Sequence, residues 1–302
     1  MPIPFLGELA ALATSLFFSI GPTFFTLAGR LVGSAIVNRS RLLVATLILI
    51  VIHAVFLGEF LPLSADPERW WWLGLSGVIG LTLGDAALFQ AFVQLGARLT
   101  MLVFSLSPVL SAIMAWLFLN ETLSGIEILG ISVTIAGVLW VVSENQNGGE
   151  DKADRSLYMK GLFFAFLGAI GQASGLITAK LGLYGDFSAL SGQVMRMLAA
   201  TVAIWLFTII SGKARETIDQ IRNTPLSTRY ILLGAIFGPV IGVYFSLVAV
   251  QFAPIGIAST LMALPPIFLI PIDYFVFKEK VSARAIVGTV IALAGVAILF
   301  LI

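Results

Sequence analysis

The sequence predicts an all-α polytopic membrane protein whose ten transmembrane helices form two inverted five-helix repeats. The 302-residue chain is 59% hydrophobic and only 11% charged, with a mean hydropathy of +1.04. Its apolar residues fall in blocks of roughly 18 to 25, the length at which a helix crosses a hydrocarbon core, and they lack the alternation of membrane strands. Seven residues also recur 158 positions later: Gly80, Gly84, Pro108, Glu121, Gly130, Ala136 and Gly137 return as Gly238, Gly242, Pro266, Glu279, Gly288, Ala294 and Gly295.

The apolar blocks place the ten spans at residues 5–27, 35–57, 70–93, 97–119, 124–142, 158–181, 187–210, 229–251, 255–277 and 283–302. Asp66 and Pro67 provide an N-cap and a first-turn proline ahead of span three. Ser124 and Glu127 have the spacing of a capping box at the start of span five, and Ser282 is the expected N-cap of span ten. The first span follows no basic segment, so we expect it to be retained rather than cleaved.

A polar linker at 143–157 separates the first repeat, residues 1–142, from the second, residues 158–302. Because each repeat has an odd number of spans, the second enters the membrane from the opposite side, which is a common architecture of secondary transporters. A second polar stretch, 211–228, has room for a short interfacial helix.

Composition also limits the chemistry. The chain has no cysteine and one histidine, His53, so disulfides and thiolate sites are excluded, and a zinc site cannot be built from His53 alone. We expect no cofactor and no metal. The chain has no Lys/Arg-rich run, so its charge pattern does not indicate a nucleic-acid partner. The expected partners are the lipid bilayer and a small-molecule substrate, with protons as a further candidate.

The basic residues suggest an orientation in the cell membrane. We call the side that holds both chain ends the terminal side, and the side that holds the loops after odd-numbered spans the odd-loop side. Fourteen of the 17 Lys and Arg residues lie on the odd-loop side and three on the terminal side. The positive-inside rule therefore predicts that both termini are outside the cytoplasm.

The repeated motifs carry a family resemblance. Leu-Ser-Pro108, Glu121, Gly130 and Ala136-Gly137 recur as Leu-Pro-Pro266, Glu279, Gly288 and Ala294-Gly295, and Leu-Gly84-Asp85-Ala-Ala-Leu-Phe occurs in span three. Over essentially its whole length the chain resembles the EamA-type, ten-helix transporters of the drug/metabolite transporter superfamily.

The resemblance implies a secondary transporter that moves a small metabolite, usually outward, by alternating access. It implies a central cavity lined mainly by helices 1, 3, 4, 6, 8 and 9, with helices 5 and 10 outside it. Relatives are generally drawn with both termini in the cytoplasm, which conflicts with the charge count above.

Asp85 is the sharpest functional candidate, because it lies near the centre of span three, where a carboxylate costs a few kcal/mol. It could couple transport to protons or bind a cationic group. Equally, it could be a structural acid paired with an arginine. Thr82 shares its helix face. The repeat counterpart of Asp85 is Val243, so a role for Asp85 would break the pseudo-symmetry.

Arg41 and Arg196 correspond to each other in the repeats, and each follows an amide, Asn38 or Gln193, by three residues. They could recognise an anion or form a salt bridge with Asp85 that changes during transport. Because the arginine occurs in both repeats, we favour a scaffold role, with side chains that reach the headgroups.

Small polar residues form a second group of candidates. Ser15, Ser19 and Thr23 are four residues apart along span one, and Gln172 lies in the matching region of span six. They could line the cavity, or they could form hydrogen bonds where helices pack closely. Tyr244 in span eight is a weaker candidate of the same kind.

Prolines inside spans four and nine, Pro108, Pro265 and Pro266, predict kinks that could act as hinges. We expect Asp273, just before the cluster of Lys278, Glu279 and Lys280, to form an interfacial salt bridge.

These features favour a transporter over the two other classes considered. An intramembrane aspartyl protease needs two carboxylates close together, and Asp85 has no evident carboxyl partner. A channel needs polar residues repeated along several pore-lining helices, and this chain has too few of them. A non-transporting scaffold is the remaining alternative.

Overall fold

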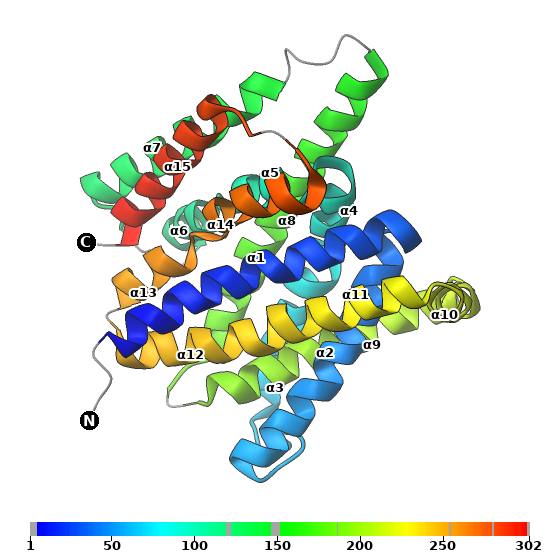
Figure 1. Cartoon of the computed structure of the whole chain (residues 1–302). Helices are drawn as coiled ribbons and strands as arrows, with labels where there is room; N and C mark the ends of the chain where they lie inside the picture. Colours follow the sequence, from blue (N-terminus) through cyan, green and yellow to red (C-terminus); the bar gives the residue numbers. More distant parts are fainter. Residues whose placement is uncertain are drawn as a thin grey trace.

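A computed structural model describes residues 5–118, 122–145, 152–185, 187–253, 255–279 and 281–300, and in these ranges the regular structure is entirely helical (Figure 1). In the described residues, nine helical segments are long and apolar enough to cross a membrane: Leu6–Val32, Ser34–Leu57, Pro67–Leu95, Ala97–Phe118, Gly125–Glu144, Arg155–Gly182, Ala189–Ile210, Pro225–Ser246 and Thr260–Phe277. They correspond to the first nine expected spans. A shorter apolar helix, Ala283–Leu299, lies at the expected tenth.

Six of the spans are largely continuous helices. These are α1 (Leu6–Val32), α2 (Ser34–Leu57), α7 (Gly125–Asn145), α8 (Lys152–Gly182), α9 (Ala189–Ile210) and α15 (Ala283–Phe300). The predicted capping box is confirmed, because the Ser124 N–H donates to the Glu127 carboxylate at 2.6 Å and the Glu127 N–H donates to Ser124 Oγ at 3.2 Å. Ser282 accepts a bond from the Ala285 N–H at 3.0 Å, as an N-cap should.

The other four spans are interrupted, at matching places in the two repeats. Spans three and eight each contain a π-helical stretch. Span three consists of α3 (Pro67–Ser76), η1 (Gly77–Gly84) and α4 (Asp85–Leu95). Span eight consists of α11 (Pro225–Ala235), η2 (Ile236–Gly242) and α12 (Val243–Phe252). Spans four and nine are broken near their middles. Span four consists of α5 (Ala97–Phe104) and α6 (Ser107–Phe118). Span nine consists of α13 (Ile255–Met262), α14 (Pro265–Ile272) and η3 (Asp273–Phe277). The duplication therefore extends to the irregular backbone.

Equivalent residues of the two repeats meet reciprocally where α7 packs on α15 (Figure 1). A Cβ added to Gly130 would lie 2.9 Å from the Gly295 carbonyl oxygen, and one added to Gly137 would lie 2.8 Å from the Gly288 carbonyl oxygen. Gly288 and Gly295 are the repeat counterparts of Gly130 and Gly137. Contacts that exchange counterparts in this way require two antiparallel helices related by a pseudo-two-fold axis, the relation expected of inverted repeats.

The repeats are also interleaved. Gly175 of α8 lies against Gly80 of η1, where an added Cβ would be 2.9 Å from the Gly80 Cα. In the corresponding contact, a Cβ added to Gly21 of α1 would lie 3.0 Å from the Gly238 Cα of η2. The first helix of each repeat thus packs on the third helix of the other, with glycines that allow the backbones to approach closely.

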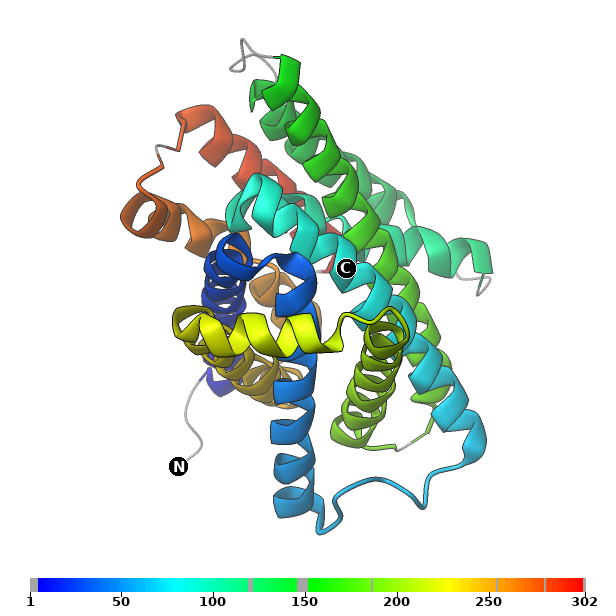
Figure 2. The ribbon, with the colours of Figure 1, turned by 90° about the vertical axis from the view of Figure 1, so that its right-hand side faces the viewer.

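The expected interfacial helix is present as α10 (Ala214–Asn223). It lies roughly perpendicular to α11, at one end of that helix (Figure 2). The hydroxyl of Thr217 accepts a hydrogen bond from Arg39 Nη1 at 2.6 Å, which ties α10 to the start of α2. The repeated Glu121 and linker residues 146–151 lie outside the described residues.

Candidate functional site

The candidate site is a cavity of about 740 Å³ at the point where spans four and nine are broken. Pro108 opens α6 beside one break, and Pro265 and Pro266 open α14 at the other; all three hinge candidates line the cavity. Proline leaves the carbonyl four residues earlier without its usual amide partner, so polar backbone groups are available at the cavity wall. Phe18 of α1 and Gln172 of α8 complete the central part of the lining.

From the breaks the cavity extends toward the terminal side. Its lining follows α6 to Ala115 and α8 to Leu183, the residue just past the end of that helix, and it includes Met262 at the end of α13. Glu127 and Leu299, from the terminal-side ends of α7 and α15, also contribute. The implied lining is thus borne out for spans one, four, six and nine. Spans three and eight contribute no lining residue among those described, whereas spans five and ten, expected outside, each contribute one at the edge.

An ion pair joins the repeats on the odd-loop side. Arg98 Nε, at the start of α5, lies 2.8 Å from Asp273 Oδ2 in η3, and the two side chains are 13% and 6% exposed. The Glu279 N–H donates to the Asp273 carbonyl at 3.1 Å, and the Glu279 carboxylate is 3.9 Å from Arg30 of α1. Asp273 was expected to pair near its own loop, and its partner Arg98 was not anticipated. The repeat counterparts of Arg98 and Asp273 are Gly256 and Ala115, so the terminal side cannot form this pair.

Asp85, the first residue of α4, forms a buried ion pair with Arg41 of α2. The Asn38 amide oxygen accepts bonds from Arg41 Nε and Nη2 at 3.2 and 3.1 Å, and the guanidinium lies 4.8 Å from the centre of the Phe89 ring. Of the alternatives for Asp85 and Arg41, the structure therefore shows the salt bridge. Arg41 is only 6% exposed, so in this conformation it does not reach the headgroups.

Arg196, the counterpart of Arg41, is less completely paired. Its Nη1 donates to the Gln193 amide oxygen at 3.4 Å, and its buried Nε has no partner among the described residues. It lies within electrostatic range of Asp85. Arg196 Nη2 and Gln172 Oε1 approach the same point beside Gly80, 3.7 and 3.6 Å from where a Cβ would stand. Gln172 therefore connects this charged cluster to the cavity wall.

The hydroxyls of α1 support the break in span nine and do not line the cavity. Ser15 donates to the carbonyl of Leu261, the group that Pro265 cannot reach with an amide, and Ser19 donates to the Pro265 carbonyl at 3.1 Å. Both serines are fully buried. Of the two alternatives for this group, the structure shows the hydrogen bonds between closely packed helices.

The remaining candidates lie away from the cavity. Thr82 donates to the Ala200 carbonyl at 3.1 Å, linking η1 to α9. Tyr244 is 52% exposed and packs edge-on against Phe245. Neither lines the cavity, so the structure does not bring these two candidates to the site.

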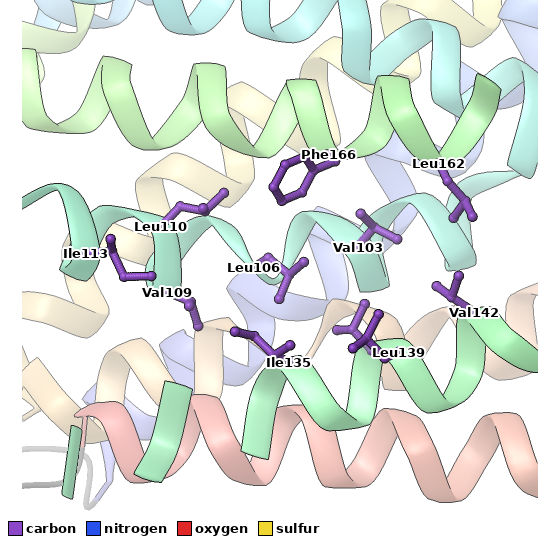
Figure 3. Close-up of a pocket in the computed structure, with 11 residues that line it drawn as sticks. Val103, Leu106, Val109, Leu110, Ile113, Ile135, Leu139, Val142, Leu162 and Phe166 are labelled. Atoms are coloured by element: carbon purple, nitrogen blue, oxygen red, sulfur yellow. The ribbon is translucent and has the colours of Figure 1, made fainter. Parts of the chain in front are cut away.

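A second hollow, of about 380 Å³, lies between α5, α6, α7 and α8. Figure 3 shows its lining, which consists only of aliphatic side chains and Phe166. Without a polar group to orient a ligand, it has no chemistry of a specific binding site.

Comparison with known proteins agrees with this architecture. The sequence profile of the EamA-like transporter family matches residues 5–143 and again residues 159–301. The chain belongs to the EamA-like transporter family. It is a multi-pass membrane transporter of the drug/metabolite transporter superfamily, and its two profile matches are the two repeats.

Individual relatives add less. An uncharacterized transporter of Clostridium kluyveri (strain ATCC 8527 / DSM 555 / NBRC 12016 / NCIMB 10680 / K1) is 28% identical over 145 residues, which is 47% of this chain and 44% of that protein. The match thus spans under half of the relative. A solved crystal structure superposes with a TM-score of 0.58 over 98% of this chain and 96% of its own, at 15% identity. At that identity the likeness concerns the fold alone.

Proposed function

We propose that this EamA-like transporter is a secondary active exporter of a small metabolite, such as an amino acid or a similar amphipathic compound, and that it works by alternating access. The observation that carries the proposal is the cavity at the paired breaks of spans four and nine, one from each inverted repeat. Discontinuous helices at a repeat interface are where secondary transporters bind their substrates. The cavity volume of about 740 Å³ lies within the usual range for small-molecule sites.

Asp85 is the proposed proton-coupling residue. It is a buried carboxylate in the middle of span three, it is paired with Arg41, and the repeat offers no second acid at the equivalent position. A proton that neutralises Asp85 would leave Arg41 and Arg196 without a counter-charge and so would favour a rearrangement of α2, α4 and α9. Buried intramembrane acids of this kind commonly form proton relays.

The experiment begins with a thermal-shift screen of the purified protein against amino acids, nucleobases, cationic drugs and sugars, since a ligand that binds the folded state raises its melting temperature. Hits are then measured for transport in proteoliposomes, with and without a proton gradient. Ala263→Trp, which would fill the cavity, should abolish transport. The exposed Ser132→Ala on α7 should not change it. Transport unaffected by Ala263→Trp would refute the assignment of this cavity.

A further inference from the structure

The cavity lining is amphipathic. Phe18, Phe104, Leu176 and Met262 provide apolar surface. Hydroxyl and amide groups are concentrated at the breaks and on the adjoining faces of α6 and α8: Ser105, Ser107, Ser111 and Gln172. A ligand with an apolar body and one polar group suits this lining.

The lining at the breaks includes hydrogen-bond donors. The 12-residue helix α6 begins at the break, so the positive end of its dipole lies at the cavity. Pro108 has no N–H, and the Leu110 N–H donates to the Leu106 carbonyl at 2.8 Å, so the amides of Ser107 and Val109 are the ones left in the first turn. Ser107, its first residue, is 6% exposed and lines the cavity, and its hydroxyl makes no hydrogen bond among the described residues. One turn later, the buried hydroxyl of Ser111 likewise has no partner there. Two unpaired hydroxyls beside a helix N-terminus suit an acceptor with several lone pairs.

The formal charges nearby favour an anion. In the adjoining cluster Asp85 contributes −1, whereas Arg41 and Arg196 contribute +1 each, which leaves a surplus of +1 in a low-dielectric region. The cavity lining itself contains one cation, Lys180, and one anion, Glu127. The Glu127 carboxylate already accepts the Ser124 amide at 2.6 Å. No described carboxylate lies at the breaks to receive a cationic ligand.

We propose that the substrate bears a carboxylate or similar anionic group on an apolar body, and that this group docks at the start of α6, between Ser107, Ser111 and Gln172. Arg196, behind Gln172, contributes its positive charge without direct contact. This inference rests on the proposed transport function and narrows its substrate class. It assigns Ser107 and Gln172 as residues that determine specificity for the charge of the substrate.

The test uses three probes with the same phenylpropyl body: 3-phenylpropionate, 3-phenylpropionamide and 3-phenylpropylamine. Their binding to the full-length protein in nanodiscs is measured by calorimetry at pH 8, where the acid is ionised and the amine is cationic. We expect the acid to bind at least about tenfold more tightly than the amide, as one charge-assisted hydrogen bond would provide. The amine should bind most weakly. Equal or tighter binding of the amide or the amine, or no binding of the acid, would overturn the proposal.

Variants locate the effect. Ser107→Ala and Gln172→Leu should reduce acid binding more than amide binding, because hydrogen bonds to an ionised acceptor are the stronger ones. Arg196→Gln should reduce the acid preference, and Arg196→Lys should retain part of it, because the lysine keeps the charge. Ser132→Ala is the matched hydroxyl control. If Ala263→Trp blocks transport of a neutral or cationic solute, the transport function stands and only the anion assignment fails.

Discussion

At the scale of single residues, the pair of Asp85 and Arg41 illustrates how charge is tolerated inside this membrane protein. Each ion is expensive alone in a low-dielectric region, and here each has the other as its counter-charge, with Asn38 occupying further donors of the guanidinium. Breaking such a pair from one side costs more than removing both partners, because the remaining charge stays buried.

A double-mutant cycle tests this pair. Asp85→Asn should lower the free energy of unfolding by about 3–5 kcal/mol and abolish proton-dependent transport. Arg41→Gln in the same background should recover much of the stability but not the transport. Thermal denaturation in detergent gives the stability, and proteoliposome flux gives the transport. Unchanged flux with the same pH dependence in Asp85→Asn would remove Asp85 from the coupling mechanism.

The serines of α1 allow a second test at this scale. Replacing Ser15 or Ser19 with alanine should destabilise the fold by about 1–3 kcal/mol, because a carbonyl at the span-nine break loses a buried donor. Thr14→Ala is the matched control, since its buried hydroxyl bonds only to Ala10 of the same helix. Equal melting temperatures for Ser15→Ala and Thr14→Ala would show that the break does not depend on these bonds.

The sequence supplied the candidates at this scale but not their partners. The depth of Asp85 in span three was readable from the hydropathy pattern, and the structure shows it paired. Two arginines stood at comparable depth, so the sequence could not choose between Arg41 and Arg196. Arg98 and Asp273 both lie near the odd-loop ends of their spans. Comparing depths between spans four and nine would have suggested that pair.

At the scale of helices, glycine contacts determine which spans pack together. Glycines lie four apart in spans three and eight, a spacing that favours close packing in lipid, and the structure shows such packing of Gly175 on Gly80 and of Gly21 on Gly238. What the glycines could not reveal is the partner helix, since a small-residue face fits any equally flat neighbour. The repeat predicted the shared irregularities only in part: the proline breaks were expected, and the π-helical stretches η1 and η2 were not.

Gly175→Ala should destabilise the protein by about 1–3 kcal/mol, the usual cost of overpacking, because its new methyl would lie 2.9 Å from the Gly80 Cα. Gly74→Ala is the control. Its Cβ would meet nothing nearer than the Ala199 Cβ at 3.6 Å, and alanine is the better helix former. Melting temperatures of the two variants in detergent provide the comparison. A Gly175→Ala protein as stable as Gly74→Ala would contradict the packing described here.

At the scale of the whole molecule, the two sides of the membrane differ. The cavity extends toward the terminal side, while Arg98 and Asp273 join the repeats on the odd-loop side. The asymmetry follows from the sequence, because the counterpart positions carry Gly256 and Ala115. For alternating access, the odd-loop side must break this ion pair in order to open, whereas the terminal side has no equivalent pair to break.

Thiol labelling can test this difference, because the chain contains no native cysteine. A cysteine at Ala263 should react with a membrane-impermeant reagent added on the terminal side. A cysteine at Met101 should react from the odd-loop side only weakly, and faster once Asp273→Asn weakens the ion pair. Asp66→Asn, which removes the partner of Arg69 in a pair with an exposed carboxylate, is the control. Equal labelling rates at Met101 in all backgrounds would show that the pair does not hold this side closed.

The orientation of the molecule is a separate prediction. The surplus of Lys and Arg on the odd-loop side predicts that both termini are outside the cytoplasm. A C-terminal fusion to a reporter that is active only in the cytoplasm should therefore be silent, and a fusion to a reporter active only outside should be active. The opposite pattern would place the termini in the cytoplasm, as in relatives of the family.

The interleaving of the repeats has a consequence for biosynthesis. The glycine face of span three is covered by α8, which is synthesised only after the linker. Domains made first normally fold first during synthesis. Here the first five spans leave the ribosome before span three can complete its packing. During that interval the glycine face of span three lacks its partner helix α8. Its assembly must wait for the second half to arrive in the opposite orientation.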